Sequence, residues 1–182
     1  MELKETIESI TLGGGCFWCL EPIFEQLNGV KKIIVGYAGG TRKNPSYEQV
    51  CTGTTGHAEV VQIQFDPEKI SLESILEVFF KTHDPTTLNR QGADTGTQYR
   101  SIILFNSDQQ KMIAEKVIRD LSNNQSFSNP IVTQVVALEA FFPAEEYHQQ
   151  YFKKNPWAGY CRAVIQPKVK KFEHLFNDLK KA

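Results

Sequence analysis

The sequence predicts an α+β fold, a two-layer sandwich in which helices cover a mixed β-sheet. Segments in which apolar and polar residues alternate predict strands, and segments with apolar residues three or four apart predict helices. Along the chain these segments follow in the order strand, helix, strand, strand, helix, strand. This order is the split βαβ arrangement of ferredoxin-like domains, and a C-terminal extension follows it. No internal repeat, low-complexity tract or linker interrupts the pattern. We therefore expect one domain over residues 1–182.

The first strand–helix pair contains the turn that matters most for function. Residues 7–12 alternate polar and apolar side chains and predict a strand, which ends in a run of three glycines. Residues 20–27 have apolar side chains at helical spacing. Because proline has no N–H to donate, Pro22 belongs among the first positions of a helix. We therefore expect the regular helix to begin near residue 19 or 20.

The other core elements follow from the same patterns. Residues 30–37 and 58–65 are rich in β-branched side chains and alternate, so both predict strands. Ser71 is a suitable N-cap for a helix that continues to residue 80. Residues 99–105 predict the last core strand. Beyond it we expect a helix over 108–123, a strand over 132–138, a short helix over 144–154 and a C-terminal helix over 169–181. Long surface loops are expected at 36–46, 82–97 and 122–130.

Composition excludes several classes of protein. The chain has 41% hydrophobic and 23% charged residues, which is typical of a globular protein in water. Its net charge of −1 gives no reason to expect nucleic acid or an anionic membrane as a partner. The first eight residues hold three Glu and no apolar run, so we expect neither a secretory signal nor a membrane span. A cytoplasmic location is the resulting expectation.

Two of the four cysteines stand close together after the glycine run, as Cys16-Phe17-Trp18-Cys19. Four cysteines are too few for a disulfide scaffold, so this spacing favours redox chemistry or metal binding. Cys16 would lie just before the helix, where free backbone N–H groups favour a thiolate and hence a nucleophile. The plainer interpretation is that Cys16 is a small apolar residue buried in a tight turn.

Two further interpretations of the cysteine pair fit less well. A structural zinc ion needs four ligands, but Cys51 and Cys161 stand alone and the four histidines are scattered. We therefore expect no metal. A thioredoxin-like motif would have small residues or proline between its cysteines, not two bulky aromatics. Phe17 and Trp18 pack in the core or form an apolar pocket for a methyl or thioether group.

The chain resembles the A-type methionine sulfoxide reductases, the peptide-methionine (S)-S-oxide reductases. The similarity runs from about residue 11 to 161. It rests on motifs that follow the family's order: GGCFW at 14–18, GYAGG at 36–40, PSYEQVC at 45–51, TGHAE at 55–59, HDPTT at 83–87, GADTGTQYRS at 92–101 and AEEYHQ at 144–149. The resemblance implies an enzyme that reduces the S epimer of methionine sulfoxide, free or in proteins, without a cofactor.

The resemblance also implies roles for single residues. Cys16 attacks the sulfoxide sulfur and is left as a sulfenic acid. Glu59 protonates the departing oxygen, which requires a pKa raised by burial. Tyr47 and Tyr99 hydrogen-bond the same oxygen, and Asp94 organises the site. From the residues alone, Glu59 also fits a solvent-facing strand position, the tyrosines fit ordinary packing, and Asp94 fits a turn.

Recycling of the sulfenic acid requires a second cysteine and then thioredoxin. Cys161 resembles the family's C-terminal resolving cysteine, but an amphipathic helix follows it where many members have a glycine-rich tail. Cys19 lies one helical turn from Cys16 and is the slightly favoured candidate. We expect Cys51 to be inert and His57 and His148 to be structural. The alternatives are a thioredoxin-like disulfide oxidoreductase or thiol peroxidase that uses Cys16 and Cys19, and a zinc-stabilised interaction module.

Overall fold

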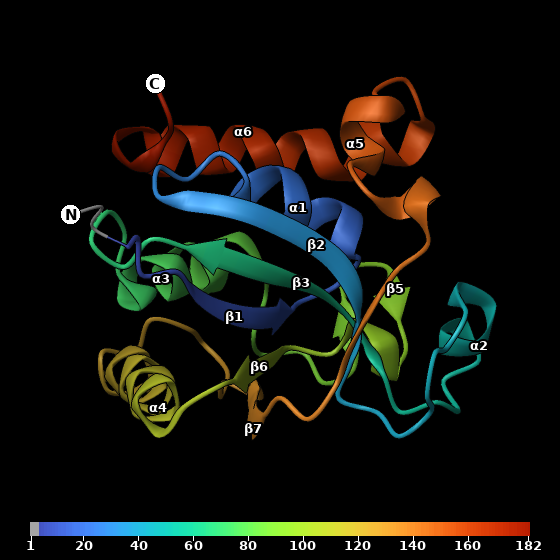
Figure 1. Cartoon of the computed structure of the whole chain (residues 1–182), viewed down its shortest axis with the longest axis horizontal. Helices are drawn as coiled ribbons and strands as arrows, with labels where there is room; N and C mark the ends of the chain where they lie inside the picture. Colours follow the sequence, from blue (N-terminus) through green and yellow to red (C-terminus); the bar gives the residue numbers. More distant parts are fainter. Residues whose placement is uncertain (1–3) are drawn as a thin grey trace.

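A six-stranded sheet in the order β7-β6-β1-β3-β2-β8 forms the centre of the computed structural model, which describes residues 4–182 (Figure 1). Within it, β6-β1-β3-β2 pair antiparallel, so β1 and β2 run parallel on either side of β3. This is the predicted split βαβ arrangement. Only β7 pairs parallel, with β6, among the described strands of the sheet, which makes it mixed as expected. The core elements are β1 (Glu8–Gly13), α1 (Phe17–Phe24), β2 (Val30–Ala38), β3 (Ala58–Phe65), α3 (Leu72–Thr82) and β6 (Ile102–Phe105).

The main hydrophobic core lies between the sheet and its helices. Alternate residues of β3, such as Val61, Ile63 and Phe65, are fully buried in this core together with side chains of α1 and α3. The intervening residues, such as Val60, belong to a smaller apolar cluster on the other face, against which Leu138 packs. Because both faces of β3 are covered, a polar side chain on this strand has little access to water.

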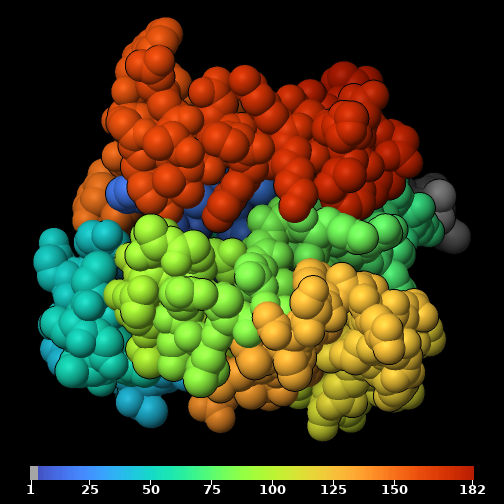
Figure 2. All heavy atoms as spheres, turned by 180° about the vertical axis from the view of Figure 1, so that it is seen from behind, coloured from blue at the N-terminus to red at the C-terminus, as the bar shows by residue number. Residues whose placement is uncertain are grey.

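The C-terminal extension covers the helical face of the sheet. It comprises α4 (Asp108–Asn123), β7 (Gln134–Ala137), β8 (Phe141–Pro143), α5 (Tyr151–Lys154), a π-helical turn over Cys161–Ile165 and α6 (Gln166–Leu175). Helix α6 packs against α1 and α3. In the view from behind, little of the blue N-terminal part remains visible beneath the orange and red C-terminal part (Figure 2). No helix of the described part is long and apolar enough to cross a membrane.

Helix α1 begins earlier than the sequence predicts. It starts at Phe17 with Cys16 as its N-cap, so Pro22 lies inside the helix and leaves the Trp18 carbonyl without its usual N–H partner. The early start is possible because a side chain from β3 accepts the first helical N–H, that of Phe17. The prediction of a start near residue 19 or 20 was therefore wrong, because the hydrogen-bond acceptor that allows the early start belongs to a strand 42 residues further along the chain.

Several shorter elements also differ from the predictions. Cys51 ends a helix, α2 (Tyr47–Cys51), whose N-cap Ser46 forms a capping box with Gln49. The loop expected at 82–97 contains a small hairpin of β4 (Arg90–Gln91) and β5 (Asp94–Thr95). The last core strand begins at residue 102, because a 3₁₀ turn over Thr97–Tyr99 precedes it. The helix expected at 144–154 is a 3₁₀ turn followed by α5, and α6 replaces the helix expected at 169–181.

Candidate active site

Cys16 lies at the junction between β1 and α1, where the glycine run turns the chain. It is the N-cap of α1, with extended backbone angles, and only 8% of its surface is exposed. Gly15 precedes it with φ +94°, and an added Cβ there would meet Gln91 at 2.7 Å. The Gly15 N–H also donates to the Tyr99 carbonyl at 3.1 Å. The turn therefore needs glycine at this position and is fastened to the segment that carries Tyr99.

Glu59 points from β3 towards the start of α1. Its Oε1 accepts a hydrogen bond from the Phe17 N–H at 3.2 Å, and its Oε2 is buried without a hydrogen-bond partner. Only 1% of the residue is exposed, so the solvent-facing interpretation is wrong. Burial raises the pKa of Glu59 to about 8, although the hydrogen bond from Phe17 acts in the opposite direction. The side chain therefore holds a proton at neutral pH.

The environment of Cys16 does not favour a thiolate in the resting site, contrary to the expectation from its place before a helix. Burial, followed by the negative charge of Glu59, raises the pKa of Cys16 well above its usual range, and the Trp18 N–H opposes this only in part. A proton on Glu59 removes the neighbouring negative charge and so makes the thiolate less unfavourable. The ionisation of Cys16 is thus coupled to the protonation of Glu59.

Tyr47 and Tyr99 approach the same carboxyl from two other segments. Tyr47 opens α2, where its N–H donates to Glu145 Oε2 at 3.1 Å, and Tyr99 ends the 3₁₀ turn. Burial is the main cause that raises the pKa of each phenol, and the charge of Glu59 adds to it in both cases. Both hydroxyls therefore stay protonated near Glu59 and are able to donate hydrogen bonds.

Asp94 is connected to Cys19 through a tyrosine from the C-terminal extension. The Tyr160 hydroxyl donates to Asp94 Oδ2 at 2.7 Å and lies 3.7 Å from Cys19 Sγ. Tyr160 directly precedes Cys161 in the sequence, and no local pattern marks it as part of the site. Its hydroxyl joins the hairpin of Asp94 to the helix of Cys19.

The two aromatic side chains after Cys16 differ in burial and in their contacts. Phe17 is fully buried, whereas Trp18 is half-buried and stacks on Tyr151 at 3.7 Å between ring centroids. The Trp18 Nε1–H donates to His148 Nδ1 at 3.0 Å. Neither Tyr151 nor His148 is predicted as a site residue from the sequence, although His148 belongs to the AEEYHQ motif. The structure thus brings both predicted aromatics to Cys16 and adds two neighbours.

The cysteines have distinct surroundings. All four carry free thiols, with Cys16, Cys19 and Cys161 buried and Cys51 exposed. Burial raises the pKa of Cys19, while Lys168 and the hydrogen bond with Tyr160 oppose this effect. Burial alone raises the pKa of Cys161, which lies in the π-helical turn. Among residues 4–182, no three or more His, Cys, Asp and Glu side chains are grouped to hold a metal ion.

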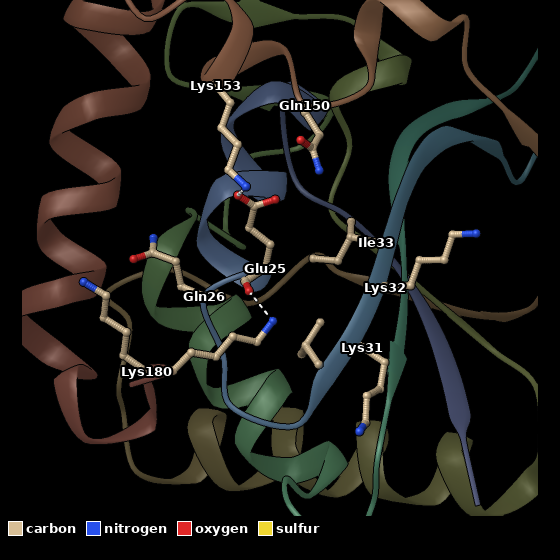
Figure 3. A pocket seen from close by; sticks show the side chains of 10 residues that line it. Glu25, Gln26, Lys31, Lys32, Ile33, Gln150, Lys153 and Lys180 are labelled. Atoms are coloured by element: carbon tan, nitrogen blue, oxygen red, sulfur yellow. Dashed lines mark hydrogen bonds and ion pairs between the residues drawn. The ribbon is translucent and has the colours of Figure 1, made fainter. Parts of the chain in front are cut away.

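A separate hollow of about 590 Å³ lies at the far end of α1, between β2, α5 and the C-terminus (Figure 3). Its walls carry several lysines, most of which already have acidic or carbonyl partners. Lys153 pairs with Glu25 at 3.1 Å, and the Lys181 ammonium donates to the Glu25 carbonyl at 2.9 Å. Because none of the predicted site residues lines it, this hollow is not part of the candidate active site.

Comparisons with known proteins agree with this geometry. The sequence profile of the family described as "Peptide methionine sulfoxide reductase" matches residues 8–180. The chain is 58% identical to peptide methionine sulfoxide reductase MsrA of Trichodesmium erythraeum over 94% of this chain and 97% of the relative. It is 54% identical to the MsrA of Polynucleobacter asymbioticus over 96% and 92% of the two chains.

Solved structures give the same result. Mxr1 of Saccharomyces cerevisiae in reduced form has a TM-score of 0.79 at 39% identity, covering 85% of this chain and 89% of that one. Methionine sulfoxide reductase A of Corynebacterium diphtheriae has a TM-score of 0.81 at 34% identity, covering 87% and 79%. Mxr1 in complex with Trx2 matches with a TM-score of 0.57 at 28% identity, covering 82% and 90%.

Proposed function

The chain belongs to the peptide methionine sulfoxide reductase family, and on this premise we propose that it is a peptide-methionine (S)-S-oxide reductase. As an oxidoreductase acting on methionine sulfoxide, it needs a nucleophile for sulfur and a proton donor for oxygen. The observation that carries the proposal is the buried Glu59 carboxyl, held by the N–H of Phe17, the residue next to Cys16. The substrate is the S epimer, free or in proteins. Residues 1–182 act as one domain, of which the first three lie outside the described residues.

In the reductive step, oxygen moves from the substrate to Cys16. The Cys16 sulfur attacks the sulfoxide sulfur while Glu59 gives a proton to the oxygen, and the proton of the thiol restores Glu59. The attack forms an S–S bond between Cys16 and the substrate. This bond and the S–O bond of the substrate then break as an S–O bond to Cys16 forms. The products are a thioether, reduced by two electrons, and a Cys16 sulfenic acid, oxidised by two. No cofactor takes part.

Three further side chains assist this step. Tyr47 and Tyr99 donate hydrogen bonds to the sulfoxide oxygen and stabilise the negative charge that develops on it. Both remain protonated because burial raises the pKa of each. Asp94 organises the site through Tyr160. Phe17 and Trp18 provide the apolar surface that receives the methyl group.

Recycling proceeds through Cys19. Its backbone N–H bonds to the Cys16 carbonyl at 3.0 Å, so the two cysteines occupy the same helical turn. The Cys19 thiol attacks the sulfenic acid, an S–S bond forms and water leaves. Thioredoxin then reduces this disulfide with two electrons and returns both thiols. The structural relative Mxr1 forms a complex with Trx2, which supports this partner. Cys161 is the competing candidate for the resolving role.

The site and the composition support the remaining assignments. Oxidised proteins and free methionine sulfoxide are the substrates, and neither nucleic acid nor a membrane is a partner. A cytoplasmic location agrees with thioredoxin as the reductant. A simple disulfide oxidoreductase or thiol peroxidase would make no use of the buried acid Glu59 and its two phenols, and is therefore not favoured.

An assay on separated epimers of methionine sulfoxide, with dithiothreitol as reductant, tests the proposed function. Wild type should consume the S epimer only, and Cys16→Ser should consume neither. The exposed Cys51 provides the matched control, because Cys51→Ser replaces a thiol of the same chain by a hydroxyl that keeps a hydrogen-bonding group beside Tyr47. Equal use of both epimers, or activity that survives in Cys16→Ser, would overturn the assignment.

A further inference from the structure

The segment 144–151, here called the brace, supports the site without taking part in the proposed chemistry. Glu145 accepts hydrogen bonds from the Tyr37 hydroxyl at 2.9 Å and from the Tyr47 N–H at 3.1 Å. The Gln149 side chain accepts from the Val35 N–H at 3.1 Å and donates to the Val35 carbonyl at 3.0 Å. These bonds fasten the brace to β2 and to the start of α2, on both sides of one buried residue, His148.

His148 contacts three of the predicted site residues at once. Its Nδ1 accepts the indole N–H of Trp18 at 3.0 Å. Its ring centroid lies 5.1 Å from that of Phe17 and 4.6 Å from that of Tyr47. The residue is completely buried. One histidine therefore lies behind the two aromatic residues and one of the phenols assigned to the substrate.

The hydrogen bond from Trp18 determines the form of His148. Burial lowers the pKa of His148, so the ring is neutral. Because Nδ1 accepts the hydrogen bond from Trp18, the single ring proton is on Nε2. Nε2 is buried and has no hydrogen-bond partner. An unpaired buried donor destabilises a fold, so an apolar ring would serve packing better. What an apolar ring would lack is the acceptor for Trp18.

Tyr151 completes this arrangement from the same segment. Its ring is nearly parallel to the Trp18 indole, with an angle of 7° and 3.7 Å between centroids. Stacking alone leaves the indole free to slide or turn in its plane, whereas a hydrogen bond at Nε1 fixes both. His148 and Tyr151 together therefore define the orientation of Trp18, while the half-buried remainder of the indole is available for contact.

We propose that His148 is a positioning residue that holds the Trp18 indole as the wall of the methyl-binding site. It acts through the Nδ1 acceptor, not by exchanging a proton with the substrate. The proposal deepens the proposed function and rests on it, because the methyl group is the ligand that Trp18 is assigned to receive. Loss of the acceptor should weaken binding of methionine sulfoxide and leave the transfer of oxygen to Cys16 largely intact.

Two variants separate the acceptor from the packing. His148→Phe keeps a flat ring but has no acceptor, whereas His148→Asn is smaller but places Oδ1 close to the position of Nδ1. We expect His148→Phe to raise KM for methionine sulfoxide about 10-fold with kcat within about 3-fold of wild type. We expect His148→Asn to stay within about 3-fold of wild type in both. If His148→Phe does not fold, His148→Leu provides a second variant without an acceptor.

The indole N–H resonance of Trp18 gives a readout that does not depend on turnover. The chain has two tryptophans, so Trp18→Phe assigns the signal. We expect the resonance to move and to exchange faster with water in His148→Phe, and to remain near its wild-type position in His148→Asn. An unchanged resonance and KM in His148→Phe would overturn the proposal, as would equal damage in both variants. Failure of wild type to reduce methionine sulfoxide would instead contradict the proposed function, and the resonance would still test the hydrogen bond.

Discussion

The backbone N–H of Phe17 donates to Glu59 Oε1 at 3.2 Å, which joins the first residue of α1 to the central strand of the sheet. This bond orients the carboxyl so that one oxygen is an acceptor for the protein and the other, Oε2, stays without a partner. A carboxyl held in this way presents its second oxygen as the place for a proton. The bond therefore positions both the proposed acid and the residue that follows the proposed nucleophile.

Replacement of the acid should slow the reductive step. Glu59→Gln keeps an acceptor for the Phe17 N–H but has no acidic proton, so we expect a rate about 10²-fold or more below wild type. The measurement is a single turnover of the S epimer, followed by the methionine formed per enzyme. Glu48→Gln is the matched control, because Glu48 is exposed on α2. A change of only a few-fold in Glu59→Gln would remove Glu59 from the role of acid.

The pH profile of the same step should fall at alkaline pH. Burial raises the pKa of Glu59 to about 8, so the proton donor is present below that pH and is lost above it. We expect the single-turnover rate to decline roughly tenfold per pH unit above about 8. Glu59→Gln should lack this decline. A wild-type rate that continues to rise above this pH would assign the step to thiolate formation alone.

The same carboxyl should make stability depend on pH. The pKa of Glu59 is higher in the folded state than its ordinary value, so the folded state binds the proton more tightly. This contribution is complete below the ordinary pKa and is lost as pH rises towards about 8. Urea titrations at about pH 5 and about pH 9 measure this effect. Over that interval the free energy of unfolding of wild type should fall by on the order of a few kcal/mol more than that of Glu59→Gln. Parallel stability curves for the two proteins would contradict the raised pKa.

Local patterns were sufficient for the fold and for part of the site. The alternation over Ala58–Phe65 and the helical spacing over Asp108–Asn123 gave the bounds of β3 and α4 as observed. Helix α1 could not be placed from its own residues, because its first N–H is satisfied by Glu59 from another strand. Strand β8 has three residues and exists because it pairs with the edge of β2, which no local pattern indicates.

The supporting residues of the site were beyond sequence reasoning for the same reason. Cys16, Glu59 and the aromatic pair lie in motifs, but the motifs do not state whether Glu59 is buried. Tyr160 and His148 act through contacts with Cys19 and Trp18, at separations of 141 and 130 residues. The motif that contains His148 does not indicate which group forms a hydrogen bond with its ring. Only the assembled fold identifies the Nδ1 acceptor.

Removal of the two phenols should also slow the reductive step. Tyr47→Phe and Tyr99→Phe each keep the ring and remove one hydrogen-bond donor, so we expect each to lower the single-turnover rate about 10-fold or more. The double variant should be slower than either. Tyr147→Phe is the control, because it makes the same substitution at a tyrosine that is 53% exposed. If the double variant equals wild type, neither hydroxyl contacts the reacting oxygen.

Turnover with thioredoxin distinguishes the two candidates for the resolving cysteine. With thioredoxin as reductant, Cys19→Ser should form about one methionine per enzyme and then stop, because the sulfenic acid on Cys16 has no partner thiol. Cys161→Ser should continue to turn over, since Cys161 is completely buried in the π-helical turn, which would have to open for its thiol to take part. Both variants should turn over with dithiothreitol, which reduces the sulfenic acid directly.

Mass spectrometry of the oxidised intermediate identifies the bond itself. After one equivalent of substrate, wild type and Cys161→Ser should show a loss of two hydrogens within the peptide that holds both Cys16 and Cys19, while Cys19→Ser should retain a sulfenic acid. The Tyr160 hydroxyl, 3.7 Å from Cys19 Sγ, must then release the sulfur for the disulfide to form. Arrest of turnover in Cys161→Ser, with full turnover in Cys19→Ser, would reverse the assignment and require the π-helical turn over Cys161–Ile165 to open during each cycle.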